Sequence, residues 1–169
     1  MNRSPKDEFL EAYNKLSDPI FRHCYFRISN RERAKELMQE VFIKAWEYIL
    51  NNNSSIKNMK ALIYKIANNL IIDEYRKKKT ISLDELSDNT GFDPGYDNRE
   101  QVDKTLDGKD ILKLLGKIDE KYREVITMRY IDELSPKEIA SLLNESENNI
   151  SVRINRGIKK IRQILKGNE

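Results

Sequence analysis

The side chains with the clearest chemical character are the basic ones near the C-terminus. Between residues 148 and 168 the sequence has no acidic residue and six basic ones, namely Arg153, Arg156, Lys159, Lys160, Arg162 and Lys166. Guanidinium and ammonium groups donate hydrogen bonds to phosphate oxygens and to guanine edges in the major groove of duplex DNA. The stretch therefore predicts a helix that binds nucleic acid, against the alternative of a basic, amphipathic helix that binds nothing.

Capping signals make this helix the second one of a helix-turn-helix. Ser135, Pro136 and Glu138 form a capping box with proline at the first helical position, which predicts the start of a short helix. Asn144 tolerates a left-handed turn, and Ser146 is suited to cap the basic helix that begins near residue 147. Two helices joined by a turn of a few residues are typical of a helix-turn-helix.

The N-terminal half of the chain predicts further helices. Residues 31–50 and 59–79 carry apolar side chains at spacings of three and four, which is the pattern of amphipathic helices. The segment NNNSSIKN at 51–58 is polar and predicts a loop between them. Upstream, residues 9–16 and 19–28 predict two shorter helices, with Asp18 as cap and Pro19 in the first turn of the second.

Residues for bond chemistry are scarce. His23 is the only histidine and Cys24 the only cysteine, so the chain has neither a metal-binding cluster nor an internal disulfide, and both residues are expected to contribute to packing. The sequence has no glycine-rich phosphate loop and no Ser/His/Asp set. We therefore expect no catalytic residue, no metal, no cofactor and no enzymatic activity.

The composition of the chain excludes a membrane-embedded protein. Hydrophobic residues make up 38% of the 169 residues and charged residues 35%, against typical shares of roughly 45–50% and 25%. There is no apolar run of about 18 residues, and the N-terminus lacks the core of a signal peptide. We expect a cytoplasmic protein without a membrane span.

Charge is distributed in three segments. Residues 1–79 hold 16 basic and 10 acidic residues, residues 80–109 hold 3 and 8, and residues 110–169 hold 12 and 10. The acidic segment also contains Gly91, Pro94, Gly95 and Gly108 and lacks helical periodicity. The sequence thus predicts an all-α chain of two small helical domains: a four-helix N-terminal bundle at 1–79 and a helix-turn-helix domain at 110–169, joined by an acidic flexible linker at 80–109.

Several segments resemble bacterial RNA polymerase sigma factors of the extracytoplasmic-function (ECF) group, within the sigma-70 family. ELMQEVFIKAW at 36–46 is similar to the polymerase-binding helix of that group, and MKALIYKIANNLIIDEYR at 59–76 to its promoter-melting helix. DEKYREVITMRYIDELSPKEIASLL at 119–143 and the residues 146–162 resemble its C-terminal helix-turn-helix. The resemblance covers nearly the whole chain in the right order, and it implies a transcription initiation factor.

The resemblance also implies which residues bind the partners. Core RNA polymerase would be bound by Glu36, Gln39, Glu40 and Lys44. The opened minus-ten promoter element would be bound by Asn51, Asn52, Asn53, Ser54, Ser55, Asn58, Lys60, Lys65, Asn68 and Arg76. The minus-thirty-five element would be bound by Glu147, Asn148, Asn149, Ser151, Val152, Arg153, Asn155, Arg156 and Lys160. The family leaves open an anti-sigma factor as a further partner.

Two other functions stay open on the sequence alone. A stand-alone helix-turn-helix repressor or activator explains residues 110–169 equally well, but it does not explain the Asn-rich loop followed by a basic helix. An adaptor that binds only protein partners is the second alternative, and it predicts no DNA binding even with polymerase present.

Overall fold

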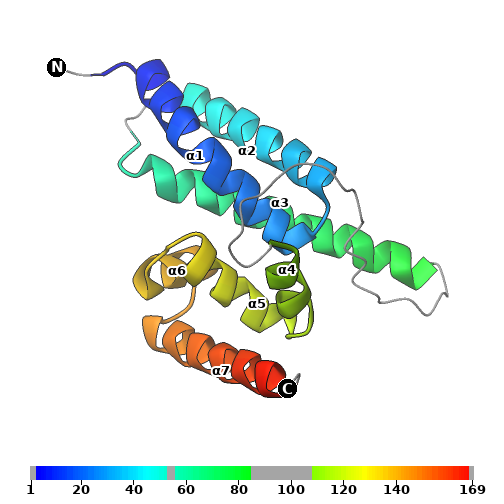
Figure 1. Ribbon diagram of the computed structural model, residues 1–169. Helices are drawn as coiled ribbons and strands as arrows, with labels where there is room; N and C mark the ends of the chain where they lie inside the picture. Colours follow the sequence, from blue (N-terminus) through cyan, green and yellow to red (C-terminus); the bar gives the residue numbers. More distant parts are fainter. Residues whose placement is uncertain (1–2, 53–55, 85–107, 168–169) are drawn as a thin grey trace. The chain divides into compact units, whose positions relative to one another are not determined.

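The computed structural model describes residues 3–52, 56–84 and 108–167, and every regular element within these ranges is a helix (Figure 1). The chain divides into two compact units, Met1–Thr90 and Gly91–Glu169. The predicted all-α architecture of two helical domains is confirmed. Most of the acidic linker, at 85–107, lies outside the described residues.

The N-terminal unit is a bundle of three helices that contact one another pairwise (Figure 1). Its elements are α1 (Pro5–Ile28), α2 (Arg31–Asn52) and α3 (Met59–Asp84). Fully buried side chains from all three helices form its core: Ile20, Cys24, Ala34, Leu37, Val41, Ala45, Ile63, Ala67 and Ile71. The apolar stripes that the sequence displays at helical spacing therefore face each other inside the bundle.

The prediction of four N-terminal helices was wrong, because α1 is continuous through Pro19. Proline in a helix interior costs about 3 kcal/mol, since it lacks the N–H donor and its ring crowds the preceding turn. Buried residues lie on both sides of this position, Ala12 before it and Ile20 and Cys24 after it. Burial of one unbroken stripe against α2 and α3 offsets the local cost, and Asp18 lies within the helix instead of capping one.

The described part of the C-terminal unit, residues 108–167, contains five helical elements. They are α4 (Gly108–Gly116), α5 (Glu120–Ile126), the π-helix η1 (Thr127–Ile131), α6 (Pro136–Leu143) and α7 (Glu147–Lys166). The capping box of Ser135 and Glu138 is present, Asn144 has a left-handed φ of 58°, and the Ser146 hydroxyl accepts a hydrogen bond from the backbone N–H of Asn149. The predicted helix-turn-helix is therefore confirmed as α6 and α7.

Gly157 allows α7 to lie close against α5. A β-carbon at this position would lie 3.0 Å from Cγ1 of Ile126 and 3.4 Å from Cβ of Tyr122. Ile150 and Ile154 on the same stripe of α7 are buried as well. This contact determines which face of α7 points away from the unit.

We expect Gly157→Leu to destabilise the C-terminal unit by about 1–3 kcal/mol or more, because its side chain would have to displace Ile126 from a close-packed site. Gly157→Ala is the matched control, since its gain in helix propensity of about 1 kcal/mol opposes a smaller clash. Urea unfolding followed by circular dichroism measures both changes. Equal unfolding curves for the Leu variant and the wild type would contradict the close contact.

Candidate functional site

The outer face of α7 is polar and basic. Asn148, Val152, Asn155, Arg156 and Lys159 are all exposed, and their spacing of three and four places them on one side of the helix. This side lies opposite the stripe that packs against the rest of the unit. Four of these residues were assigned to the minus-thirty-five element from the sequence. Lys159 was counted among the basic residues of the helix but was not assigned to that element, although its spacing from Val152 and Asn155 was visible.

The other assigned residues of α7 lie at the rim of this face. Glu147 and Asn149 are exposed in the first turn, and Ser151 is half-buried. The ammonium group of Lys160 lies 4.0 Å from a carboxylate oxygen of Asp119 and 5.4 Å from the centre of the Tyr122 ring. Lys160 therefore points toward α5 more than toward the centre of the outer face.

Arg153 does not lie on the outer face. Its guanidinium pairs with Glu145 in the turn before α7 and, at 3.5 Å, with Glu124 of α5. Only 18% of the Arg153 side chain is exposed. The sequence predicted a DNA contact for Arg153 because its charge is visible there. Its pairs with Glu145, eight positions away, and Glu124, 29 positions away, form only when the unit folds.

The residues assigned to polymerase binding share one side of α2. Glu36, Gln39 and Lys44 are exposed and Glu40 is half-buried. Ile43, which the sequence analysis passed over, lies on the same side with 59% of its surface exposed.

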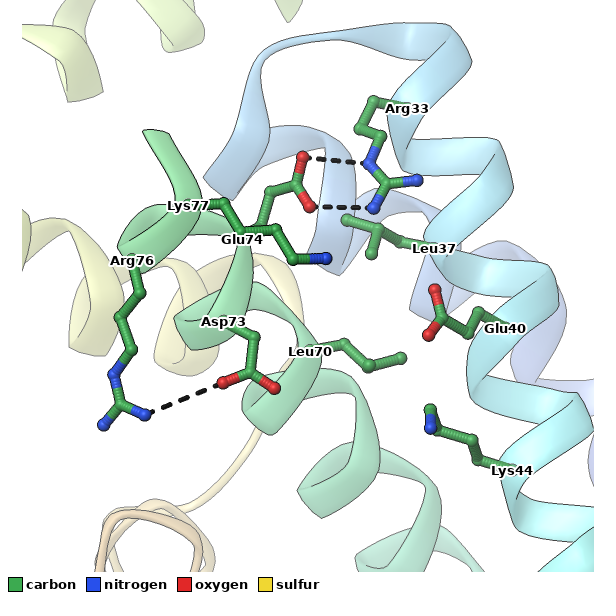
Figure 2. A pocket seen from close by; sticks show the side chains of 9 residues that line it. All are labelled: Arg33, Leu37, Glu40, Lys44, Leu70, Asp73, Glu74, Arg76 and Lys77. Carbon is green, nitrogen blue, oxygen red and sulfur yellow. Dashed lines mark hydrogen bonds and ion pairs between the residues drawn. The ribbon is translucent and has the colours of Figure 1, made fainter. Parts of the chain in front are cut away.

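A groove of about 320 Å³ separates this side of α2 from α3. Figure 2 shows Leu37 and Leu70 between its walls, Glu40 and Lys44 on α2, and Arg76 with its ion-pair partner on α3. The structure thus brings residues assigned to polymerase together with a residue assigned to DNA.

An ion pair closes one end of the groove. Figure 2 shows both hydrogen bonds of this pair: Nε and Nη2 of Arg33 on α2 donate to the two carboxylate oxygens of Glu74 on α3 at 2.9 and 2.8 Å. These hydrogen bonds lower the pKa of Glu74 below its ordinary value of 4.5, and Arg33 is in turn held charged by Glu74 and Glu36. The pair fixes α2 against α3 at the groove.

The asparagines around the α2–α3 loop have different roles. Asn51 and Asn52 are exposed at the end of α2, and the Asn52 side chain donates to the Tyr48 carbonyl at 2.9 Å. The Asn58 carboxamide oxygen accepts from the backbone N–H of Ala61 at 3.0 Å and so caps α3. The assigned residues Asn53, Ser54 and Ser55 lie outside the described residues.

One face of α3 carries Lys65 and Arg76, which are exposed and three helical turns apart. Lys60 is exposed on a different side of the helix. Asn69 lies between Lys65 and Arg76 on the exposed face, and the sequence analysis did not select it.

Asn68 is not on this exposed face, contrary to expectation. It is 3% exposed, and its side-chain oxygen accepts a hydrogen bond from buried Arg27 at 3.4 Å. Tyr75 donates from its hydroxyl to the carbonyl of Arg27 at 2.6 Å. Asn68 follows Tyr64 by four residues and precedes Ile71 by three, so the spacing of the buried stripe already contained this signal.

Two further properties concern the described part of the chain. None of its helices combines the length and apolar character that a bilayer crossing requires. Nor does it contain a group of three or more His, Cys, Asp or Glu residues arranged to hold a metal ion.

Family models match both units. The model of sigma-70 region 2 matches residues 12–81, and that of sigma-70 region 4 matches residues 108–161. The ECF RNA polymerase sigma factor SigW of Bacillus subtilis is 32% identical over an alignment that covers 98% of this chain and 93% of SigW.

Solved structures share the fold. The sigma factor RpoE of Bartonella quintana, in complex with the anti-sigma factor NepR, is 20% identical with a TM-score of 0.79 and covers 95% of this chain and 98% of its own. CnrH, in complex with the cytosolic domain of CnrY, is 18% identical with a TM-score of 0.72 and covers 98% and 92%.

The Arg33–Glu74 ion pair has a pH-dependent consequence. Because Glu74 titrates at lower pH when folded, the pair stabilises the protein above the unfolded pKa near 4.5, and this contribution is lost as pH falls through the folded pKa. We expect Glu74→Gln to lower the free energy of unfolding by about 1–3 kcal/mol at pH 7. The difference from wild type should shrink toward acid pH.

Urea unfolding at a series of pH values measures this difference. Glu32→Gln is the matched control, because it removes a carboxylate from an ion pair on the surface. The Glu32 side chain is 80% exposed, and its oxygen lies 3.5 Å from the ammonium group of exposed Lys35. A difference for Glu74→Gln that stays constant through the acid range would refute the proposed contribution of its charge.

Proposed function

Because the chain belongs to the ECF sigma factors of the sigma-70 family, we propose that it recognises both a minus-thirty-five and a minus-ten promoter element and opens the latter. Membership in this family implies promoter-specific initiation of transcription together with RNA polymerase, and it implies no bond chemistry by the chain itself. We propose that this takes place in the cytoplasm, with residues 1–79 and 110–169 as functional domains and 80–109 as their linker.

The outer face of α7 supports recognition of the minus-thirty-five element, and it is the observation that carries the proposal. A helix of this kind enters the major groove, where each base pair presents a distinct pattern of donors and acceptors. Val152 offers methyl groups to a thymine methyl, Asn155 an amide to adenine, and Arg156 a guanidinium to guanine. Lys159 is suited to a phosphate.

The rim of α7 supports contacts with the DNA backbone. Backbone N–H groups at a helix N-terminus bind phosphate, and Asn148 and Asn149 lie there with Glu147. Ser151 and Lys160 flank the outer face. These contacts fix the register of the helix on the duplex without reading its sequence.

The N-terminal unit supports capture of the opened minus-ten strand. A base that is read in this state must leave the stack, at a cost of a few kcal/mol. We propose that the amides and hydroxyls around the α2–α3 loop bind such a base, namely Asn51, Asn52, Asn53, Ser54, Ser55 and Asn58. Lys60, Lys65 and Arg76 would follow the phosphates, as a positively charged groove does. Asn68 is not among the residues proposed to bind DNA, because its side chain is buried.

The α2 face supports docking on core polymerase. Glu36, Gln39 and Lys44 provide polar contacts around exposed Ile43, and Glu40 lines the groove toward α3. Interfaces of this type derive most of their affinity from a buried apolar centre, while the polar rim provides specificity. We also propose an anti-sigma factor as a further partner, because RpoE, with which this chain shares its fold, was solved in complex with one.

Run-off transcription with core polymerase and a randomised promoter library tests the proposal. We expect transcripts only when the chain is added, from templates that share sequence at two positions separated by a spacer. Core polymerase that initiates no differently with the chain would overturn the proposal. Binding of the chain to a duplex operator without polymerase would instead support a stand-alone regulator.

The substitution Arg156→Ala should weaken promoter binding by the holoenzyme and relax base preference at one minus-thirty-five position. The expected loss is about 1–3 kcal/mol if the contact is bidentate. Lys113→Ala on α4 is the control, since Lys113 is exposed on another helix of the same unit. Unchanged selectivity of the Arg156 variant in the library assay would count against this assignment.

The substitution Glu40→Lys should abolish binding of core polymerase while the helix content stays unchanged. It reverses a charge at the groove without replacing a core residue. Asp18→Lys, an exposed charge reversal on α1, is the control and should bind normally. Pull-down of core enzyme measures both; normal capture by the Glu40 variant would show that polymerase docks elsewhere.

A further inference from the structure

Arg153 lies in the helix proposed to read DNA, yet its side chain is committed within the protein. Nη1 lies 3.5 Å from Oε2 of Glu124 on α5, and Nη2 bonds to Oε1 of Glu145 in the turn before α7. The exposed fractions of the three side chains are 18%, 17% and 33%. One guanidinium therefore joins three separate parts of the C-terminal unit.

This arrangement holds α7 in orientation. The turn that connects α6 to α7 sets the angle between these two helices. The bond from Arg153 to Glu145 ties this connection to the second helical turn of α7. The bond to Glu124 fixes the same point of α7 to α5, on the flank of the stripe of Ile150 and Ile154. Ion pairs that are largely removed from solvent are screened less by salt than exposed pairs.

A contact between Arg153 and DNA would be costly. The guanidinium would have to leave both carboxylates, and two partly buried negative charges would remain without this partner. Glu145 and Glu124 would then lie beside a helix that approaches phosphates of the same sign. Arg156, three residues on, is exposed on the outer face and needs no such rearrangement.

We propose that Arg153 is a positioning residue, which holds α7 at the angle needed for major-groove recognition through Glu124 and Glu145 and does not touch DNA. This inference rests on the proposed function, in which α7 reads the minus-thirty-five element. It assigns both glutamates, which the sequence analysis did not select, a part in promoter recognition.

The two alternative roles of Arg153 predict opposite effects when its glutamate partners are replaced by uncharged glutamine. If Arg153 positions α7, Glu124→Gln and Glu145→Gln weaken recognition just as loss of the arginine does. If Arg153 instead contacts DNA, the same two substitutions free the guanidinium and remove negative charge near the phosphates. Promoter binding then stays the same or becomes stronger.

The experiment uses holoenzyme reconstituted from core polymerase and the full chain. Two promoters are compared, one with the preferred minus-thirty-five element from the library and one with that element replaced. We expect Glu124→Gln, Glu145→Gln and Arg153→Met each to reduce the advantage of the intact promoter, on the order of tenfold for Arg153→Met. Transcription from the promoter with the replaced element should not change. A variant that failed to fold would instead lose transcription from both promoters.

Two further readouts separate positioning from contact. The base-preference profile of Arg153→Met should weaken at all minus-thirty-five positions together, whereas Arg156→Met should weaken at one. The salt dependence of promoter binding should keep its slope in Arg153→Met, since a lost phosphate contact lowers the slope by about 0.9. Arg153→Lys, which keeps the charge and one ion pair, should recover part of the activity.

Unchanged or stronger minus-thirty-five recognition by both glutamine variants would overturn the inference, as would a single-position effect of Arg153→Met. If Arg153→Met does not fold, the glutamine variants still decide, because they keep the shape of the side chains. A wild-type holoenzyme that does not distinguish the two promoters would refute the proposed function itself, which is a different result.

Discussion

Ion pairs between neighbouring helices determine which cationic side chains of this protein are available to partners. The chain carries 31 basic and 28 acidic residues, so many cations have a carboxylate within reach once the helices pack. Arg33 is held by Glu74 across α2 and α3, and Arg153 by Glu124 and Glu145 around α7. A charge-assisted pair that is partly shielded from solvent is screened less by salt than a pair on the surface. The net charge of the chain therefore does not predict which face binds another molecule. What decides this is which cations already pair with a carboxylate of the protein itself.

Within each unit these pairs hold in place the helices that carry a proposed binding surface. In the C-terminal unit, the close approach at Gly157 and the pairs of Arg153 turn Val152, Asn155 and Arg156 outward. In the N-terminal unit, the Arg33–Glu74 pair closes the groove whose walls carry Glu40 and Lys44. A binding side chain must be held in place by residues whose own conformations are fixed. The ion pairs therefore position the side chains of the two proposed interfaces.

The wrong predictions at Asn68 and Pro19 have different physical origins. Asn68 and Asn69 are adjacent and identical in type, but a rotation of 100° per residue buries the first beside Arg27 and exposes the second. The helix break expected at Pro19 is absent, because the packing of α1 against α2 and α3 offsets the local cost of the proline. The caps of the C-terminal unit were predicted correctly, because Ser135, Asn144 and Ser146 act on their own backbone within three or four residues.

The local features and the family resemblance are encoded in the residues of each segment. Helix periodicity, capping residues and the order of the segments depend on neighbours within one or two turns, and they led to the all-α architecture of two helical domains. Which arginines are held by carboxylates depends on the packing of the helices, because Glu124 is 29 positions from Arg153 and Glu74 is 41 positions from Arg33. Such pairs form when helices pack side by side, and no spacing along one helix encodes them.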